Sequence, residues 1–365
     1  MSEKKIKVGI TQGDINGIGY EVLLKVISNP AILEICTPII YGSPKVMGYH
    51  RKTLDLTSFN YSIIHSASEA ADNRINIVNC GDEETKVELG KPTQASGEAA
   101  LASLSKATEE YEKKLFDVLV TSPINKKATQ SDTFKFPGHT EYLEERLGNG
   151  QKAMMILIKD SLRVALVTGH IPISSVATAI TKESLVNKIK AFSKTLSMDF
   201  GIQKPRIAVL GLNPHAGDAG VIGNEEIETI IPALKETQEK GLLTFGPYPA
   251  DGFFGSGQFT KFDGVLAMYH DQGLAPFKTI AMDLGVNYTA GLPVIRTSPA
   301  HGTAYDIAGK NIASEESFLQ ALYMAIDVSR ARIRYNEARV NPLRKQYFEK
   351  GSDNEKLNLK EEQAD

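Results

Sequence analysis

The sequence of 365 residues predicts an α/β protein, and two observations indicate this class. Short apolar segments alternate along the chain with longer segments that have a helical pattern. Most of the apolar segments are rich in Val, Ile and Leu without polar alternation, which is typical of parallel strands covered on both faces. At roughly 150 residues per domain, a chain of this length is expected to form two domains.

The expected elements follow one another without an internal repeat or a low-complexity linker. Strands are predicted at residues 6–11, 38–41, 73–78, 117–121, 154–158, 163–168, 206–211, 264–269 and 286–289. Helices are predicted at residues 17–28, 95–114, 140–147, 182–197, 224–240 and 314–336. The segment 95–114 illustrates the helical pattern, because Ala99, Leu101, Leu104 and Ala107 are mixed with polar positions.

The charge distribution argues against a nucleic-acid partner. Lys and Arg number 41, Asp and Glu number 44, and the net charge is −3. The segment 349–365 carries six acids and three bases, so the chain before it is neutral. A neutral body offers no electrostatic attraction to a phosphate backbone. We expect residues 349–365 to form a polar tail.

The cysteines and the hydropathy predict a protein of the reducing cytoplasm. Cys36 and Cys80 show no zinc-finger spacing and are too few for a disulfide framework. No signal-peptide core and no apolar run of about 18 residues occurs, so no membrane partner is expected.

Polar, glycine-containing clusters directly follow most of the predicted strands. These clusters are at residues 13–19, 122–126, 169–170, 212–217 and 270–273. In open parallel sheets, ligands bind beyond the carboxyl ends of the strands. We therefore expect the clusters to converge on a common cleft. The cluster 13–19 lacks the GxGxxG dinucleotide pattern, and no Walker motif or serine-hydrolase elbow is present.

Three histidines, His170, His215 and His270, each follow a different predicted strand. Three imidazoles with an open fourth position form a catalytic zinc arrangement, and separations of 45 and 55 residues differ from those of a structural zinc knuckle. Such an ion would polarise a substrate oxygen. Histidines at strand ends also serve as hydrogen-bonded structural groups, and the spacing alone leaves both interpretations open.

Several other polar residues near these clusters have two interpretations each. Asp251 and Asp271 could orient a ligand histidine or assist proton removal, or they could be a loop acid and a helix cap. Lys278 and Arg296 flank Asn287 and could hold a phosphate or carboxylate, or they could be solvated surface residues.

A predicted helix start follows Pro137-Gly138. His139 and Thr140 begin it and could bind an anion, or the turn could cap the helix without a ligand.

Together, the clusters resemble the 4-hydroxythreonine-4-phosphate dehydrogenase family of pyridoxal 5′-phosphate biosynthesis. The matching motifs span roughly residues 6 to 335 and include Gly13-Asp14, Gly17-Ile18-Gly19, Glu21, Pro137-Gly138-His139-Thr140-Glu141, Thr168-Gly169-His170, Gly211-Leu212-Asn213-Pro214-His215-Ala216-Gly217, Gly246-Pro247, Pro249-Ala250-Asp251, Tyr269-His270-Asp271-Gln272-Gly273, Gly291-Leu292-Pro293 and Ile295-Arg296-Thr297-Ser298. Each motif alone is weak, but their combination in this order is specific.

The resemblance implies an isocitrate/isopropylmalate dehydrogenase-like fold, in which two α/β domains flank a central cleft. We expect residues 1–135 plus 290–348 to form the first domain and residues 136–289 the second. It also implies a homodimer that completes each site with residues from both subunits. The implied reaction is oxidation of 4-phosphooxy-L-threonine at C3 by NAD, or NADP, followed by decarboxylation to 3-amino-2-oxopropyl phosphate.

The resemblance also assigns roles to residues of this chain. The implied metal ligands are His170, His215 and His270, with zinc the expected ion and magnesium or cobalt as alternatives. The implied substrate contacts are His139, Thr140, Lys278, Asn287 and Arg296. The two aspartates that maintain the site fall on Asp251 and Asp271.

The chain departs from the family pattern at three positions: Ile15 and Tyr20 stand where proline is usual, and Ala300 stands where an aspartate usually precedes His301. A related branch acts on phosphorylated aldonic acids such as 4-phosphothreonate or 4-phosphoerythronate, and these residues do not separate the two branches. A third hypothesis is a non-catalytic protein that binds a metal or a phosphate.

Overall fold

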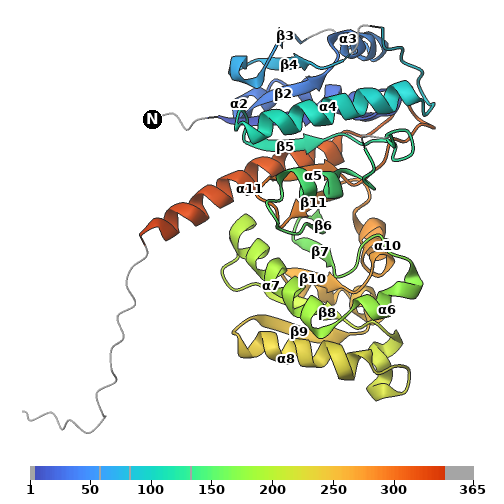
Figure 1. Ribbon diagram of the computed structural model, residues 1–365, viewed down its shortest axis with the longest axis vertical. Coiled ribbons are helices and arrows are strands. Elements are labelled where there is room, and N and C mark those ends of the chain that lie inside the picture. The colour runs from blue at the N-terminus through green and yellow to red at the C-terminus, as the bar shows by residue number, and fades with distance from the viewer. Residues whose placement is uncertain (1–4, 57–58, 82–83, 132–133, 342–365) are drawn as a thin grey trace, which may run out of the picture.

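A computed structural model describes residues 5–56, 59–81, 84–131 and 134–341, and the predicted tail at 349–365 lies outside them. The strands form one sheet with the order β3-β4-β2-β1-β5-β12-β11-β6-β7-β10-β8-β9 (Figure 1). The strands are β1 (Ile6–Thr11), β2 (Cys36–Gly42), β3 (Tyr61–Ile64), β4 (Ile75–Asn79), β5 (Val118–Thr121), β6 (Met154–Lys159), β7 (Leu162–Leu166), β8 (Arg206–Leu210), β9 (Leu243–Tyr248), β10 (Gly264–Ala267), β11 (Val286–Ala290) and β12 (Arg296–Pro299).

Helices connect the strands and cover the sheet, so the α/β class expected from the sequence is confirmed. They are α1 (Gly19–Ile27), α2 (Ile32–Ile35), α3 (Pro44–Thr53), α4 (Gln94–Glu112), α5 (His139–Leu147), α6 (Val176–Ala179), α7 (Lys182–Asp199), α8 (Ile231–Glu239), α9 (Ala250–Gly255), α10 (His270–Ala281) and α11 (Glu316–Val340). In the described part of the chain, we find no helix with the length and apolar character needed to cross a membrane.

Both outer parts of the sheet are parallel, as the apolar runs predict. Strand β1 pairs in parallel with β2 and β5, and β10 pairs in parallel with β7 and β8. Every residue of β2 is buried, because helices cover both faces of the sheet there.

The middle of the sheet is antiparallel, which corrects the expectation of parallel pairing for these strands. Strand β11 runs antiparallel to both β12 and β6, and β6 runs antiparallel to β7. The register pairs Lys159 with Leu162, so β6 and β7 form a hairpin with a two-residue turn, in which Asp160 has a φ of 50°. Because these strands are also buried on both faces, their apolar runs do not reveal their direction.

Some elements lie where the sequence predicts none. Strand β9 at the sheet edge is mostly exposed and contains a Gly-Pro pair, and β12 consists of the buried residues Arg-Thr-Ser-Pro. Helix α10 contains Gly273 and Pro276, which normally disfavour a helix interior. In each case, tertiary packing outweighs the local signal.

The sequence regions occupy different parts of the sheet. Strands β1 to β5 and β12 form one half, and β6 to β11 form the other half (Figure 1). Helix α11 packs against β12, β5 and β11 and also contacts α7, so it links the two halves. The parallel strands β7, β10 and β8 end at the same edge, which brings the segments that follow them together.

Two departures from the family pattern are absorbed by the core. The side chains of Ile15 and Tyr20 are both fully buried. The Tyr20 hydroxyl donates a hydrogen bond to Gln12 Oε1 at 2.7 Å. The residues that replace proline therefore fill the interior around α1 without leaving this hydroxyl unpaired.

Candidate active site

All five predicted substrate contacts line one cavity of about 260 Å³. The cavity lies where β5, β12, β11 and β6 meet helices α5 and α10. The predicted residues that line it are His139, Thr140, Lys278, Asn287 and Arg296, together with His170 and His270. The structure therefore brings together residues that are up to 157 positions apart, as the clustering at strand ends predicts.

The guanidinium of Arg296 is buried in the cavity wall, and the residue is only 4% exposed. Its Nε and Nη2 donate to Thr121 Oγ1 at 3.0 and 2.6 Å, and its Nη1 donates to Thr289 Oγ1 at 3.1 Å. Burial lowers the pKa of Arg296 to about 10, and Glu141 opposes this shift, so the group is charged at neutral pH. No carboxylate of the described residues forms an ion pair with it. A buried cation without a counter-ion is costly, so this site is suited to an anion.

Buried polar atoms without partners surround the same cavity. They are Ser122 Oγ, His139 Nε2, Asn287 Oδ1 and His301 Nε2, none of which has a hydrogen-bond partner among the described residues. Burial, and next the cations Arg296 and Lys126, hold the pKa of His139 well below its usual value, so its imidazole is neutral. Such atoms require partners, and a polar ligand in the cavity would supply them.

Helix α5 begins at the cavity, and the carboxylate of Glu141 in this helix lies close to His170. Glu141 lies in its first turn, and Oε1 is 3.7 Å from His170 Nδ1. A hydrogen bond to His170 is the main cause that lowers the pKa of Glu141. The cations Lys126 and Lys278 also line the cavity, and neither forms an ion pair with a described carboxylate.

Two of the predicted metal ligands lie side by side at the edge of the cavity. The rings of His170 and His270 have centroids 5.4 Å apart. His270 is the first residue of α10, three positions after the end of β10, and His170 follows β7, which pairs with β10. Asp271 Oδ1 is 2.7 Å from His270 Nδ1, so this carboxylate orients the ring and leaves the other nitrogen for a ligand.

His215 lies outside this group. It belongs to the segment Pro214–Gly220, where four non-glycine residues have φ between 43° and 53°. Left-handed residues of this kind cost roughly 1–2 kcal/mol each. The buried carboxylate of Glu226 accepts hydrogen bonds from the Leu212 and Asn213 amides, which holds the start of the segment. Within the described part of one chain, no three His, Cys, Asp or Glu residues are placed to hold a metal ion.

Asp251 is exposed on α9 and does not line the cavity. No side-chain hydrogen bond or ion pair joins its carboxylate to another described residue. The geometry of one chain therefore supports an orienting role for Asp271 and leaves the role of Asp251 an expectation.

Sequence reasoning did not assign roles to several residues that line the cavity. They are Thr121, Ser122, Lys126, Glu141, Ser298 and His301. The sequence did indicate two of them, since Ser122 and Lys126 belong to the polar cluster 122–126 that follows a predicted strand. Ala300, which stands in place of the usual aspartate, also lines the cavity beside His301.

A buried cation, neutral imidazole and further cations next to paired histidines suit a small anionic substrate that is activated at one end. The sequence profile of the pyridoxal phosphate biosynthetic protein PdxA matches residues 34–325. The chain belongs to the PdxA family. It is 65% identical over 359 residues to a 4-hydroxythreonine-4-phosphate dehydrogenase of Bacteroides thetaiotaomicron, which covers 98% of each chain.

Further relatives of this family differ in the substrate that their names specify. A relative from Oceanobacillus iheyensis has a provisional name as a D-threonate 4-phosphate dehydrogenase and is 40% identical over 334 residues, 90% of this chain and 99% of its own. Among solved structures, a 4-hydroxythreonine-4-phosphate dehydrogenase from Klebsiella pneumoniae has a TM-score of 0.76 at 31% identity and covers 90% of this chain and 99% of its own. The enzyme of that name from Burkholderia phymatum has a TM-score of 0.73 at 37% identity and covers 89% and 99%.

Proposed function

We propose that the protein is a dehydrogenase that oxidises the C3 hydroxyl of 4-phosphooxy-L-threonine with NAD, or NADP, as hydride acceptor. The resulting β-keto acid loses CO2 and gives 3-amino-2-oxopropyl phosphate, a step of pyridoxal 5′-phosphate biosynthesis. The observation that carries the proposal is the buried guanidinium of Arg296, which faces a cavity of substrate size and has no carboxylate partner among the described residues.

The phosphate end of the substrate is assigned to the part of the cavity around Arg296. Two N–H groups of a guanidinium can bind a phosphate at once, and Lys278 adds a second positive charge to the same wall. Thr140 and the start of α5 offer further donors. Asn287 Oδ1, an acceptor without a described partner, suits the amino group or a hydroxyl of the substrate.

A divalent cation, zinc or alternatively magnesium or cobalt, is assigned to His170, His215 and His270. When bound, it would polarise the C3 oxygen and the carbonyl that forms there. The paired rings of His170 and His270 and the orienting carboxylate of Asp271 suit such an ion, but one chain brings only two of the three imidazoles together.

We therefore propose that a second copy of the chain supplies the missing histidine. His215 is exposed, and large apolar side chains close to it and to His170 in the sequence face solvent in a single chain. They are Ile171 (39% exposed), Ile173 (72%), Val221 (81%) and Ile222 (44%). Exposed apolar groups of this kind are typical of an interface, and in the proposed homodimer His215 would contribute to its partner's cavity.

We further propose that residues 1–135 with 290–348 and residues 136–289 are the two domains, and that the enzyme acts in the cytoplasm. The first region contributes Arg296 and Lys126 to the cavity, and the second contributes His139, His170 and Lys278. A cavity between two domains can close on the substrate and exclude water.

The experiment that tests the proposal measures NADH absorbance with 4-phosphooxy-L-threonine and with 4-phosphothreonate, which carries a hydroxyl in place of the amino group. The relative from Oceanobacillus iheyensis makes the second compound a specific alternative. Higher kcat/KM on the amino acid supports the proposal, and higher kcat/KM on the aldonic acid assigns the chain to the other branch. No NADH from either compound would overturn dehydrogenase function and favour a non-catalytic binding protein.

A further inference from the structure

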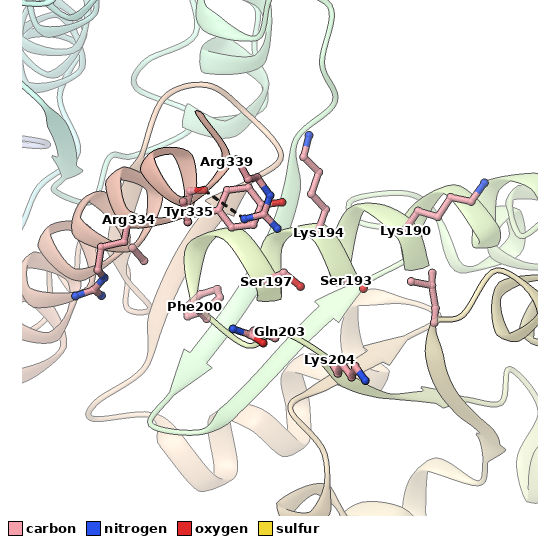
Figure 2. A pocket seen from close by; sticks show the side chains of 14 residues that line it. Lys190, Ser193, Lys194, Ser197, Phe200, Gln203, Lys204, Arg334, Tyr335 and Arg339 are labelled. Atoms are coloured by element: carbon pink, nitrogen blue, oxygen red, sulfur yellow. Dashed lines mark hydrogen bonds between the residues drawn. The ribbon is translucent and has the colours of Figure 1, made fainter. Parts of the chain in front are cut away.

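A second large pocket lies away from the active site, between the C-terminal part of α11, helix α7 and the loop that follows α7 (Figure 2). It has a volume of about 700 Å³, which is within the usual range for small-molecule sites. It shares no lining residue with the cavity around Arg296, and the proposed reaction does not use it.

The rim of this pocket is strongly basic. Its cations are Lys190 and Lys194 on α7, Lys204 on the loop, and Arg334 and Arg339 on α11 (Figure 2). No acidic residue of the described chain lines it, and none of these five cations forms an ion pair there. Lys190 and Lys194 are one helical turn apart, where like charges destabilise a helix. Because the chain as a whole has a net charge of only −3, this concentration of positive charge is local.

The inner surface of the pocket combines apolar and hydroxyl groups. Phe200, Leu242 and Ala331 contribute apolar surface, and Ser193 and Ser197 contribute hydroxyls. The ring of Tyr335 also lines the pocket, and the Arg339 guanidinium carbon lies 3.4 Å from its centroid. This composition suits a ligand with a flat or apolar body and at least one phosphate group.

The two walls of the pocket are held together by a buried ion pair. Arg332 on α11 donates from Nε to Asp199 Oδ1 of α7 at 2.7 Å, and from Nη1 to the Pro293 carbonyl oxygen at 2.8 Å. The Tyr288 hydroxyl donates to Asp199 Oδ2 at 2.5 Å. The pocket is therefore preformed, which reduces the entropy cost of binding.

Part of the wall from α11 lies beyond the residues that the family profile matches. The family profile ends at residue 325, whereas Arg334, Tyr335, Ala338 and Arg339 lie beyond it.

We propose that this pocket is a second binding site, specific for a phosphorylated small molecule of nucleotide size. The ligand places its phosphates among the five cations and its flat body against Tyr335 and the apolar floor. Because it contacts both α7 and α11, it binds across the two halves of the sheet and stabilises their arrangement.

The test measures binding of adenosine 5′-triphosphate and of inorganic pyrophosphate to the full-length protein by isothermal titration calorimetry at low and high ionic strength. The variant Lys194→Glu/Lys204→Glu reverses two charges of the rim and should raise Kd by about 10-fold or more, because contacts to charged groups are lost. The control Lys52→Glu/Lys235→Glu changes two exposed lysines outside the pocket and should leave Kd unchanged.

Stronger binding of the triphosphate than of pyrophosphate, lost in the pocket variant and retained in the control, supports the proposal. Equal binding by both double variants would overturn it, as would binding of neither probe by the unmodified protein.

A further experiment uses a chain that ends at Asn341. Residues 349–365 carry six acids, so they could compete with the probes for the basic pocket. If the probes bind only to this shorter chain, the acidic segment occupies the pocket and the proposal is wrong. Dehydrogenase activity of the pocket variant is measured separately, so a failure of the proposed function does not affect the result.

Discussion

The two ends of the candidate active site differ in how far a single chain completes them. At the Arg296 end, a buried cation, a neutral imidazole and several unpartnered polar atoms face one cavity. At the histidine end, His170 and His270 lie together, but His215 is exposed in a separate segment. In a single chain, one end is suited to an anion, whereas the other has only two of the three proposed metal ligands together.

This difference teaches that the fold places Arg296 and the three histidines of the proposed metal site by different means. Arg296 and Asn287 come from strands in the middle of the sheet, whose register fixes them, because Asn287 pairs with Ser298 and Thr289 pairs with Arg296. The histidines come from segments beyond the strand ends, where sheet pairing no longer fixes a side chain. Large apolar side chains near them in the sequence face solvent, and in the proposed homodimer contacts with the second subunit would complete their positions.

The largest expected effect is at the Arg296 end. The substitution Arg296→Met keeps side-chain length and removes the charge, so kcat/KM should fall by about 10³-fold through loss of two charge-assisted hydrogen bonds to phosphate. Steady-state kinetics measure this, and circular dichroism checks the fold. The control Arg206→Met changes an exposed arginine that pairs with Asp263 at the start of β8 and should retain activity. An active Arg296→Met enzyme would show that the phosphate binds elsewhere.

The next effect is at the incomplete end. The substitution His215→Ala should lower kcat by at least about 10²-fold, because the ion loses one of its ligands. Metal content by mass spectrometry should fall with it. His65→Ala, which removes an exposed histidine far along the sequence from the clusters, is the control. Unchanged turnover in the His215 variant would refute the metal assignment.

At the Arg296 end, the sequence predicted which residues line the cavity better than it predicted the strands that carry them. The motif residues His139, Lys278, Asn287 and Arg296 do line one cavity, although β12, which carries Arg296, was not predicted as a strand. Its Arg-Thr-Ser-Pro sequence is polar, and its burial depends on neighbouring strands that a local pattern does not show. The antiparallel centre was missed for the same reason, since burial on both faces hides strand direction.

At the histidine end, the sequence predicted the neighbouring strands but not the distance of His215 from the other two histidines. The spacing indicated that His170, His215 and His270 follow three strands, and those strands, β7, β8 and β10, are indeed neighbours. A shared sheet edge does not fix the distance between loops. The left-handed segment that carries His215 depends on the Glu226 carboxylate, a contact that no local pattern predicts.

A smaller effect concerns the support of the paired histidines. Asp271→Asn should lower metal affinity by about 10- to 100-fold, because the ring of His270 loses the carboxylate that orients it. Metal titration measures the change. Asp283→Asn alters an exposed acid just beyond the same helix and is expected to bind metal normally. Equal affinities for both variants would show that the Asp271 contact has no role in orienting the ligand.

The smallest effect concerns the pH dependence of stability, and it involves His50, a buried histidine that does not line the active-site cavity. Burial lowers the pKa of His50 to about 4, below its value of about 6.5 in the unfolded chain. The unfolded state therefore binds more protons between these values, and stability falls as the pH drops from about 6.5 towards 4. Between pH 7.5 and pH 5, His50 should lower the free energy of unfolding of the unmodified protein by about 2 kcal/mol. The variant His50→Gln should not show this loss.

Urea unfolding at the two pH values measures this change, with Lys52→Gln on the same helix as the control. The buried His139 should add to the acid sensitivity in the same direction, because burial also lowers its pKa. Identical pH dependence of the His50 variant and the unmodified protein would show that His50 accepts a proton without unfolding.

The most direct test of the central claim is complementation between two inactive chains. Arg296→Met and His215→Ala are co-expressed with different tags, and the mixed dimers are purified and assayed for NADH formation. If one chain completes the anion end and its partner supplies His215, each mixed dimer contains one site with both residues intact and recovers about half of the activity per dimer. Mixed dimers as inactive as the two parents would contradict the account, because His215 would then act within the chain that carries Arg296.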